Sequence, residues 1–117
     1  WGRAEAIALT AVRRNSSTRI GSINNVKFDS INTSGENGIL IYGENNNIEN
    51  IKFNDVFVNL EKHTSWPTND IDLRPSELNN IESHEHIIYA RNAKDIELND
   101  FNYNANGFDY DDLIDIK

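Results

Sequence analysis

The sequence predicts an all-β protein, specifically a right-handed, single-stranded parallel β-helix of roughly three to four coils, where one coil is one turn of the chain around the axis. Two observations carry this prediction: short strand-like segments repeat without gaps, and each segment alternates as a strand with one buried face does. In addition, Asn and β-branched residues dominate the chain, and both are poorly suited to helix interiors.

The repeat consists of three nine-residue segments with the same pattern. Apolar residues fill the first, fourth, sixth and ninth places, and Asn or Asp fills the third. The alternation from the fourth to the sixth place, as in Val26-Lys27-Phe28, predicts a strand. The segments are Ile23–Ile31 (INNVKFDSI), Ile48–Val56 (IENIKFNDV) and Ala93–Phe101 (AKDIELNDF).

The spacing of the segments predicts one domain over 1–117 with an inserted loop. Ile23 and Ile48 are 25 residues apart, which is a typical solenoid period. Ile48 and Ala93 are 45 residues apart, so one coil is followed by about 20 extra residues. The polar, Pro-containing stretch at about 60–85 is the expected insertion.

A second strand is expected between the repeats. Gly38–Tyr42 (GILIY) lies in one coil and Ile87–Ala90 (IIYA) in the next, and both are almost continuously apolar. Such runs are typical of parallel sheets buried on both faces. An antiparallel sandwich also uses short strands separated by Asn and Gly turns and stays open as an alternative, although the gapless repeat favours the solenoid.

Stacking of the coils predicts which side chains lie together. Equivalent residues of neighbouring coils lie about 4.8 Å apart, so Asn25, Asn50 and Asp95 are assigned to a hydrogen-bonded ladder that maintains the fold. Asn also tolerates a left-handed backbone. Phe28, Phe53 and Leu98, at the sixth place, are expected to stack in register inside the protein.

Composition narrows the function classes. The chain of 117 residues has 11 Lys and Arg against 19 Asp and Glu, a net charge of −8, which argues against nucleic-acid binding. No apolar run approaches the roughly 20 residues that span a membrane, and there is no Cys to form disulfides or thiolate metal sites. The sequence opens at Trp1 in mid-pattern and closes at Lys117 after an apparent strand, so we expect a segment of a longer protein with upstream coils.

Four stretches carry a family resemblance: Trp1–Ala6 (WGRAEA), Gly35–Gly43 (GENGILIYG), the INNVKF and IENIKF repeats, and Asp72–Pro75 (DLRP). In this order they resemble the C-terminal third of family 28 glycoside hydrolases, the polygalacturonase and rhamnogalacturonase group of the pectin-lyase-like superfamily. The resemblance implies a secreted protein, extracellular or periplasmic, that degrades polysaccharide without a cofactor.

The resemblance also implies where the chemistry lies. Family members use aspartates for inverting hydrolysis, from Asn-Thr-Asp, Asp-Asp and Gly-His-Gly motifs, with an Arg-Ile-Lys motif beside them. Asp111-Asp112 is superficially similar to the second motif, but its companions are missing, so Asp109, Asp111 and Asp112 are expected to form a solvated turn. We predict no catalytic residue in this segment and place the acid and base before Trp1.

The insertion holds the candidate substrate-binding residues Trp66, Asp70, Asp72 and Arg74. A Trp face stacks on the C–H face of a pyranose, carboxylates accept hydroxyl hydrogen bonds, and Arg binds a uronate carboxylate with two bonds. Asp70 and Asp72 project to the same side of an extended segment. The alternative is that Arg74 pairs with Asp72 or Asp70 and that Trp66 covers an exposed coil.

The three histidines raise the question of a metal. His84 and His86 are one residue apart, so both rings can lie on one strand face, as zinc ligands do. No third ligand has a suitable spacing near them or near His63, and no ordered calcium loop is visible. We predict no metal site.

Two functions remain. The first is part of a glycoside hydrolase acting on polysaccharide, in which this segment supplies scaffold and sugar contacts. The alternative is a non-catalytic β-solenoid for glycan binding or structural spacing. The decorated insertion favours the first, since a plain spacer needs no such loop.

Overall fold

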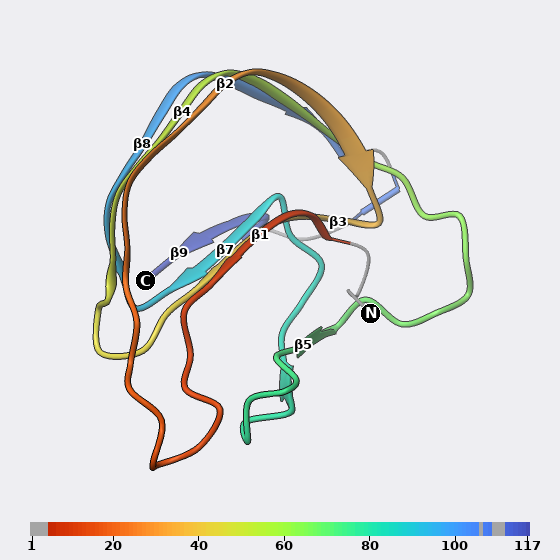
Figure 1. Ribbon diagram of the computed structural model, residues 1–117. Helices are drawn as coiled ribbons and strands as arrows, with labels where there is room; N and C mark the ends of the chain where they lie inside the picture. Colours follow the sequence, from red (N-terminus) through yellow and green to blue (C-terminus); the bar gives the residue numbers. More distant parts are fainter. Residues whose placement is uncertain (1–4, 106, 109–111) are drawn as a thin grey trace.

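A computed structural model describes residues 5–105, 107–108 and 112–117 (Figure 1). This part of the chain is all-β, without a helix, so it contains no helix long and apolar enough to cross a membrane. The strands are β1 (Glu5–Thr10), β2 (Ile23–Gly35), β3 (Asn37–Tyr42), β4 (Ile48–Leu60), β5 (Asp70–Asp72), β6 (Asn80–Glu82), β7 (Ile88–Arg91), β8 (Ala93–Asn104) and β9 (Ile114–Ile116).

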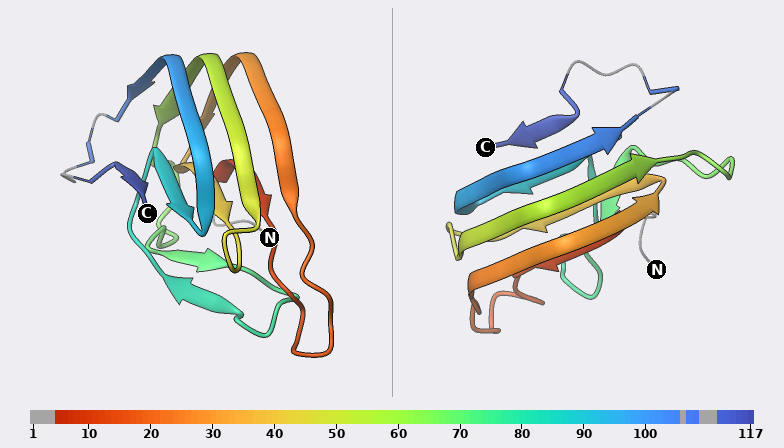
Figure 2. Two further views of the ribbon diagram at one scale, coloured as in Figure 1. Left: turned by 90° about the vertical axis from the view of Figure 1, so that its left-hand side faces the viewer. Right: turned by 90° about the horizontal axis from the view of Figure 1, so that it is seen from above.

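The strands form two parallel sheets and one hairpin. Sheet A has the order β1-β3-β7-β9 and sheet B the order β2-β4-β8, with all neighbours parallel. The chain passes from sheet A to sheet B and back, and each return adds the next strand on the same side (Figure 2). β5 and β6 pair antiparallel within the predicted insertion.

The register of sheet B confirms the predicted alignment of the repeats. Ile23 pairs with Ile48, and Ile48 pairs with Ala93. The predicted second strands also pair, with Ile39 opposite Ile88. β2, β4 and β8 extend beyond the nine-residue segments and bend as long arcs over the core (Figure 1).

Left-handed residues explain the uneven apolar spacing of the repeats. The backbone φ is positive at the third place, in Asn25, Asn50 and Asp95, as expected for the ladder positions. It is also positive at the eighth place, in Ser30, Asp55 and Asp100, where the repeat pattern alone did not predict it. A left-handed residue adds one residue to the strand and changes its direction. Inward-facing residues are therefore three positions apart where a left-handed residue lies between them, and two positions apart in the rest of the strand.

The core lies between the two sheets. β4, in the middle of sheet B, buries all its inward residues. The equivalent residues of β2 are half-buried, and so are those of β8 except Tyr103, which is exposed opposite Val58. Phe28, Phe53 and Leu98 are paired in register on the core side, which confirms the predicted stack. The fully buried core residues include Ile48, Ile51, Phe53, Val56 and Val58 of sheet B and Ile39, Ile41, Ile88 and Ala90 of sheet A.

The hairpin packs on the other face of sheet A. Leu40 and Tyr89 are neighbours in that sheet and point away from the main core. Ile71 and Leu73 of the insertion cover them and form a second, smaller apolar cluster. The insertion is therefore part of the packed structure, and only a portion of it is free to contact a ligand.

Candidate functional site

The most exposed part of the insertion is the Trp66 loop, which we define as residues 61–69 between β4 and β5. Its residues 61–67 are all exposed, and the loop projects beyond the end of sheet B (Figure 1). Trp66 is 71% exposed, the highest value among the large apolar residues in the described ranges. A bulky aromatic side chain in this position covers little of the protein and is available to a ligand.

Glu36 fastens the first half of this loop. Its Oε1 accepts hydrogen bonds from Lys62 Nζ and Thr64 Oγ1, each at 2.8 Å. Lys62 Nζ also donates to the Trp66 carbonyl oxygen. The hydrogen bonds from Lys62 and then Thr64 lower the pKa of Glu36 to about 2, so the carboxylate stays ionised at neutral pH.

Asn37 fastens the other half. Its buried side chain donates from Nδ2 to the Thr68 carbonyl at 3.0 Å and accepts the His86 backbone N–H at 3.2 Å. Thr68 Oγ1 in turn donates to Glu85 at 2.9 Å. The two ends of the insertion therefore meet at Asn37, between sheets A and B.

Gly38 completes this corner. A Cβ at Gly38 would lie 2.2 Å from the Ile87 carbonyl oxygen, so no other residue fits without moving the backbone. From the sequence, Glu36, Asn37 and Gly38 belong to a stretch that carries the resemblance, and Gly38 begins a predicted strand. The structural task of this stretch, to anchor the Trp66 loop, was missed because the partners lie 26 to 49 residues away.

The other candidate sugar-binding residues lie on the hairpin. Asp70 and Asp72 flank the buried Ile71 in β5 and share one side of the strand, as expected. Arg74 donates to Asp72 through Nε at 2.9 Å and Nη2 at 2.5 Å, which raises the pKa of Arg74. This contact agrees with the alternative interpretation of Arg74. The structure therefore groups Asp72 with Arg74 and places Trp66 on the preceding loop.

A second polar cluster joins β7 and β9. Asp115 is buried and accepts two hydrogen bonds from Arg91, each at 3.0 Å, and lies 2.9 Å from His84 Nε2. Arg91 also lies over the Tyr89 ring, at 4.0 Å from its centroid. The Arg91 hydrogen bonds hold the pKa of Asp115 well below its usual value, despite burial.

The interactions of this cluster stabilise the fold. Burial lowers the pKa of His84, but its bonds to the Glu85 carbonyl and to Asp115 outweigh burial and raise it. Both oxygens of Asp115 are occupied by cationic or donating groups, so the carboxylate is poorly placed to accept a further proton or attack a substrate. Its evident effect is to fasten the short strand β9 to β7.

Among the residues that the structure describes, the remaining candidates add no reactive site. His86 is buried with Nδ1 against the His84 carbonyl at 2.9 Å, and the described residues contain no group of three potential metal ligands. Asp112 is exposed, in agreement with a solvated turn, while Asp109 and Asp111 lie outside the described residues, as does the 1–4 portion of the first resemblance stretch.

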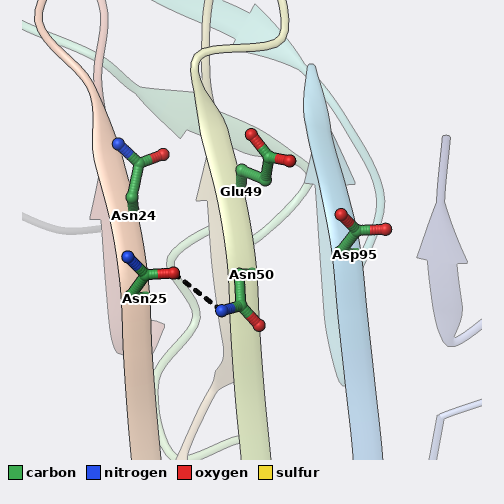
Figure 3. A pocket seen from close by; sticks show the side chains of 5 residues that line it. All are labelled: Asn24, Asn25, Glu49, Asn50 and Asp95. Atoms are coloured by element: carbon green, nitrogen blue, oxygen red, sulfur yellow. Dashed lines mark hydrogen bonds between the residues drawn. The ribbon is translucent and has the colours of Figure 1, made fainter.

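The ladder residues line an open depression of about 400 Å³ on sheet B (Figure 3). Asn50 Nδ2 donates to Asn25 Oδ1 at 2.7 Å, which confirms the predicted ladder between these two residues. Asn24, Glu49 and Asp95 complete the lining. The depression is open and polar, and three of its residues, Asn25, Asn50 and Asp95, have the left-handed backbone described above.

Comparisons with protein families, curated proteins and solved structures find no match to this chain.

Proposed function

We propose that this chain is part of a right-handed parallel β-helix in a carbohydrate-active glycoside hydrolase of the polygalacturonase-like group. In this proposal the segment supplies scaffold, and the Trp66 loop contacts sugar. The strictly alternating use of two parallel sheets and the constant register of the repeats support a β-helix. Right-handedness follows from the strong preference of crossovers between parallel strands.

The free edge of β2 supports further coils as the partner of this segment. Val26 and Phe28 are half-buried, whereas their counterparts Ile51 and Phe53 are fully buried between two neighbours. A parallel strand added beside β2 would bury these side chains and pair its backbone. Coils of the same parent protein would cover this edge in the way that β2 covers β4.

The observation that carries the sugar-binding part is the exposure of Trp66 on an anchored loop. The indole ring offers a flat face for the C–H groups of a pyranose. The contacts of Glu36 and Asn37 with Lys62, Thr64 and Thr68 hold the loop before a ligand arrives. Such preorganisation reduces the entropy lost on binding.

Catalysis is proposed to lie outside this segment. An inverting hydrolase needs two carboxyl groups roughly 6.5–9.5 Å apart, one as acid and one to activate water. Asp115 and Asp72 are both engaged by Arg side chains, so neither is available as such a pair. Because the resemblance places the acid and base before Trp1, we expect the isolated 117-residue chain to hydrolyse no polysaccharide, and turnover by the purified chain would contradict this part of the proposal.

The experiment that tests the proposal compares Trp66→Ala with Tyr103→Ala, a matched removal of an exposed aromatic residue of β8. Affinity electrophoresis against a panel of soluble plant polysaccharides measures binding. We expect Trp66→Ala to weaken binding by about threefold to tenfold, as loss of a stacking contact does, and Tyr103→Ala to leave it unchanged. Equal affinities of the wild type, Trp66→Ala and Tyr103→Ala would show that Trp66 does not contact sugar.

A further inference from the structure

We propose that the Trp66 loop selects uncharged sugar units, either neutral sugars or esterified uronates, over free uronates. This inference depends on the proposed sugar contact at Trp66 and names the class of sugar that the contact accepts. The preference follows from the net charge around Trp66, which depends on how the ionisable groups of the insertion are paired.

The two fixed cations of the insertion, Lys62 and Arg74, are already paired with carboxylates. Lys62 binds Glu36 at 2.8 Å. Arg74 holds Asp72 through two nitrogens. An Arg whose charge is balanced by a bidentate carboxylate offers little net attraction to a second carboxylate, since the incoming group also meets the first one.

Carboxylates outnumber these cations. Between residues 60 and 85 the only fixed cations are Lys62 and Arg74, whereas six acidic residues lie there: Glu61, Asp70, Asp72, Glu77, Glu82 and Glu85. Glu36 lies beneath the loop and is ionised. The backbone of Arg13 and Arg14 contacts the hairpin end of the insertion at Ser76 and Glu77, and the Arg13 side chain is paired with Glu44. The net charge of the whole chain, −8, has the same sign as the local excess. A polyanion that approaches Trp66 is therefore repelled.

The groups that remain available suit an uncharged sugar. Trp66 presents an apolar face, and the Glu61 side chain is 52% exposed five residues before it. Carboxylate oxygens accept hydrogen bonds from sugar hydroxyls, which is a favourable contact without a charged partner on the sugar. Esterification of a uronate removes its charge and leaves its ring face for stacking.

Polygalacturonate and fully methyl-esterified polygalacturonate form the decisive pair of probes, because they share ring and linkage and differ in charge. Binding of each to the full-length protein is measured by affinity electrophoresis and calorimetry at low and high NaCl. We expect the ester to bind with an affinity that salt hardly changes. The acid should bind at least several-fold more weakly at low salt, and salt should narrow the gap by screening the repulsion.

Two variants locate the effect. Glu61→Gln should improve binding of the acid polymer by about twofold to fivefold, as expected for one exposed charge, and leave the ester unchanged. Glu97→Gln, an equal change in the middle of β8, should alter neither. Trp66→Ala should weaken binding of whichever polymer the loop holds.

The outcomes separate this inference from the proposed function. Tighter binding of the acid than the ester, lost in Trp66→Ala, would overturn the preference for uncharged sugars and leave the sugar contact intact. Binding of neither polymer, nor of neutral polysaccharides, would overturn both. Preference for the ester that Trp66→Ala abolishes supports both.

Discussion

Phe28 and Phe53 stack almost face to face, with ring centroids 5.0 Å apart and an interplanar angle of 7°. They occupy the same place of two repeats and belong to adjacent strands of sheet B. Phe101 meets Phe53 edge-on at 6.1 Å. The equal register of the strands places the sixth residue of each repeat beside the sixth residue of the next, which here stacks Phe28 on Phe53 and sets Leu98 beside Phe53.

Phe53→Ala should destabilise the protein by about 3–5 kcal/mol, since Phe53 is fully buried between neighbours on both sides. Phe28→Ala should cost clearly less, because Phe28 lies in the edge strand β2 and is half-buried. Urea unfolding monitored by circular dichroism measures both. Equal losses would mean that the edge of β2 is covered in solution by another strand.

The repeat made most of the fold predictable from sequence. An identical apolar pattern in Ile23–Ile31 and Ile48–Val56 can be satisfied by stacking the two segments in register, and the structure does so. The pattern also marked Asn25 and Asn50 as ladder residues. The strands were predictable because every repeat has the same pattern of buried residues and the same preferred backbone conformations.

The site was less predictable, because its contacts join residues that the repeat does not relate. Nothing local marks Asp115 as the partner of Arg91 and His84, since only the register of β7 and β9 brings them together. The same holds for Asn37, which binds Thr68. The pairing of Arg74 with Asp72 was foreseen as an alternative because the two residues are close in sequence.

Asn50→Ala should destabilise the protein by about 1–3 kcal/mol. The backbone φ at this place is 58°, a left-handed conformation that is strained for Ala. The substitution also removes the hydrogen bond to Asn25. Asn50→Gly should lose less, because Gly adopts this backbone without strain. Asn24→Ala, at an exposed neighbouring position, is the control and should change stability by less than about 0.5 kcal/mol. Thermal unfolding compares the four proteins, and equal stability of the Ala and Gly variants would show that backbone strain is not the cause.

His86 should make the protein less stable as the pH falls. Burial lowers the pKa of His86 to about 4, while its ordinary value is 6.5. Between these pH values His86 is protonated in the unfolded chain but not in the folded chain. The free energy of unfolding therefore falls as the pH is lowered from about 6.5 to about 4, and below pH 4 His86 causes no further loss. The loss is roughly 3 kcal/mol. His84, whose pKa is raised, acts in the opposite direction over the adjoining range.

The variant His86→Gln isolates this effect, because His84 titrates in both proteins. The difference in unfolding free energy between wild type and His86→Gln, measured by urea titration from pH 4 to 8, should change across pH 4 to 6.5 and stay constant above. A difference that is independent of pH would show that His86 is accessible to protons in the folded state.

Lys62→Ala should loosen the Trp66 loop and leave the core intact. Lys62 joins Glu36 to the Trp66 carbonyl, so its removal frees both ends of that link. Hydrogen exchange read by mass spectrometry should become several-fold faster in residues 61–69 and stay unchanged in β4, while Lys52→Ala, a surface Lys of β4, should change neither. Because the pKa of Glu36 is about 2, lowering the pH of the wild type from 7 to 5 should not open the loop.

Binding of sugar to the Lys62→Ala variant decides what Lys62 does. If the variant exchanges hydrogen like wild type but still loses affinity for sugar, Lys62 contacts the ligand itself. If the variant exchanges faster and also loses affinity, the ligand depends on the anchoring of Trp66.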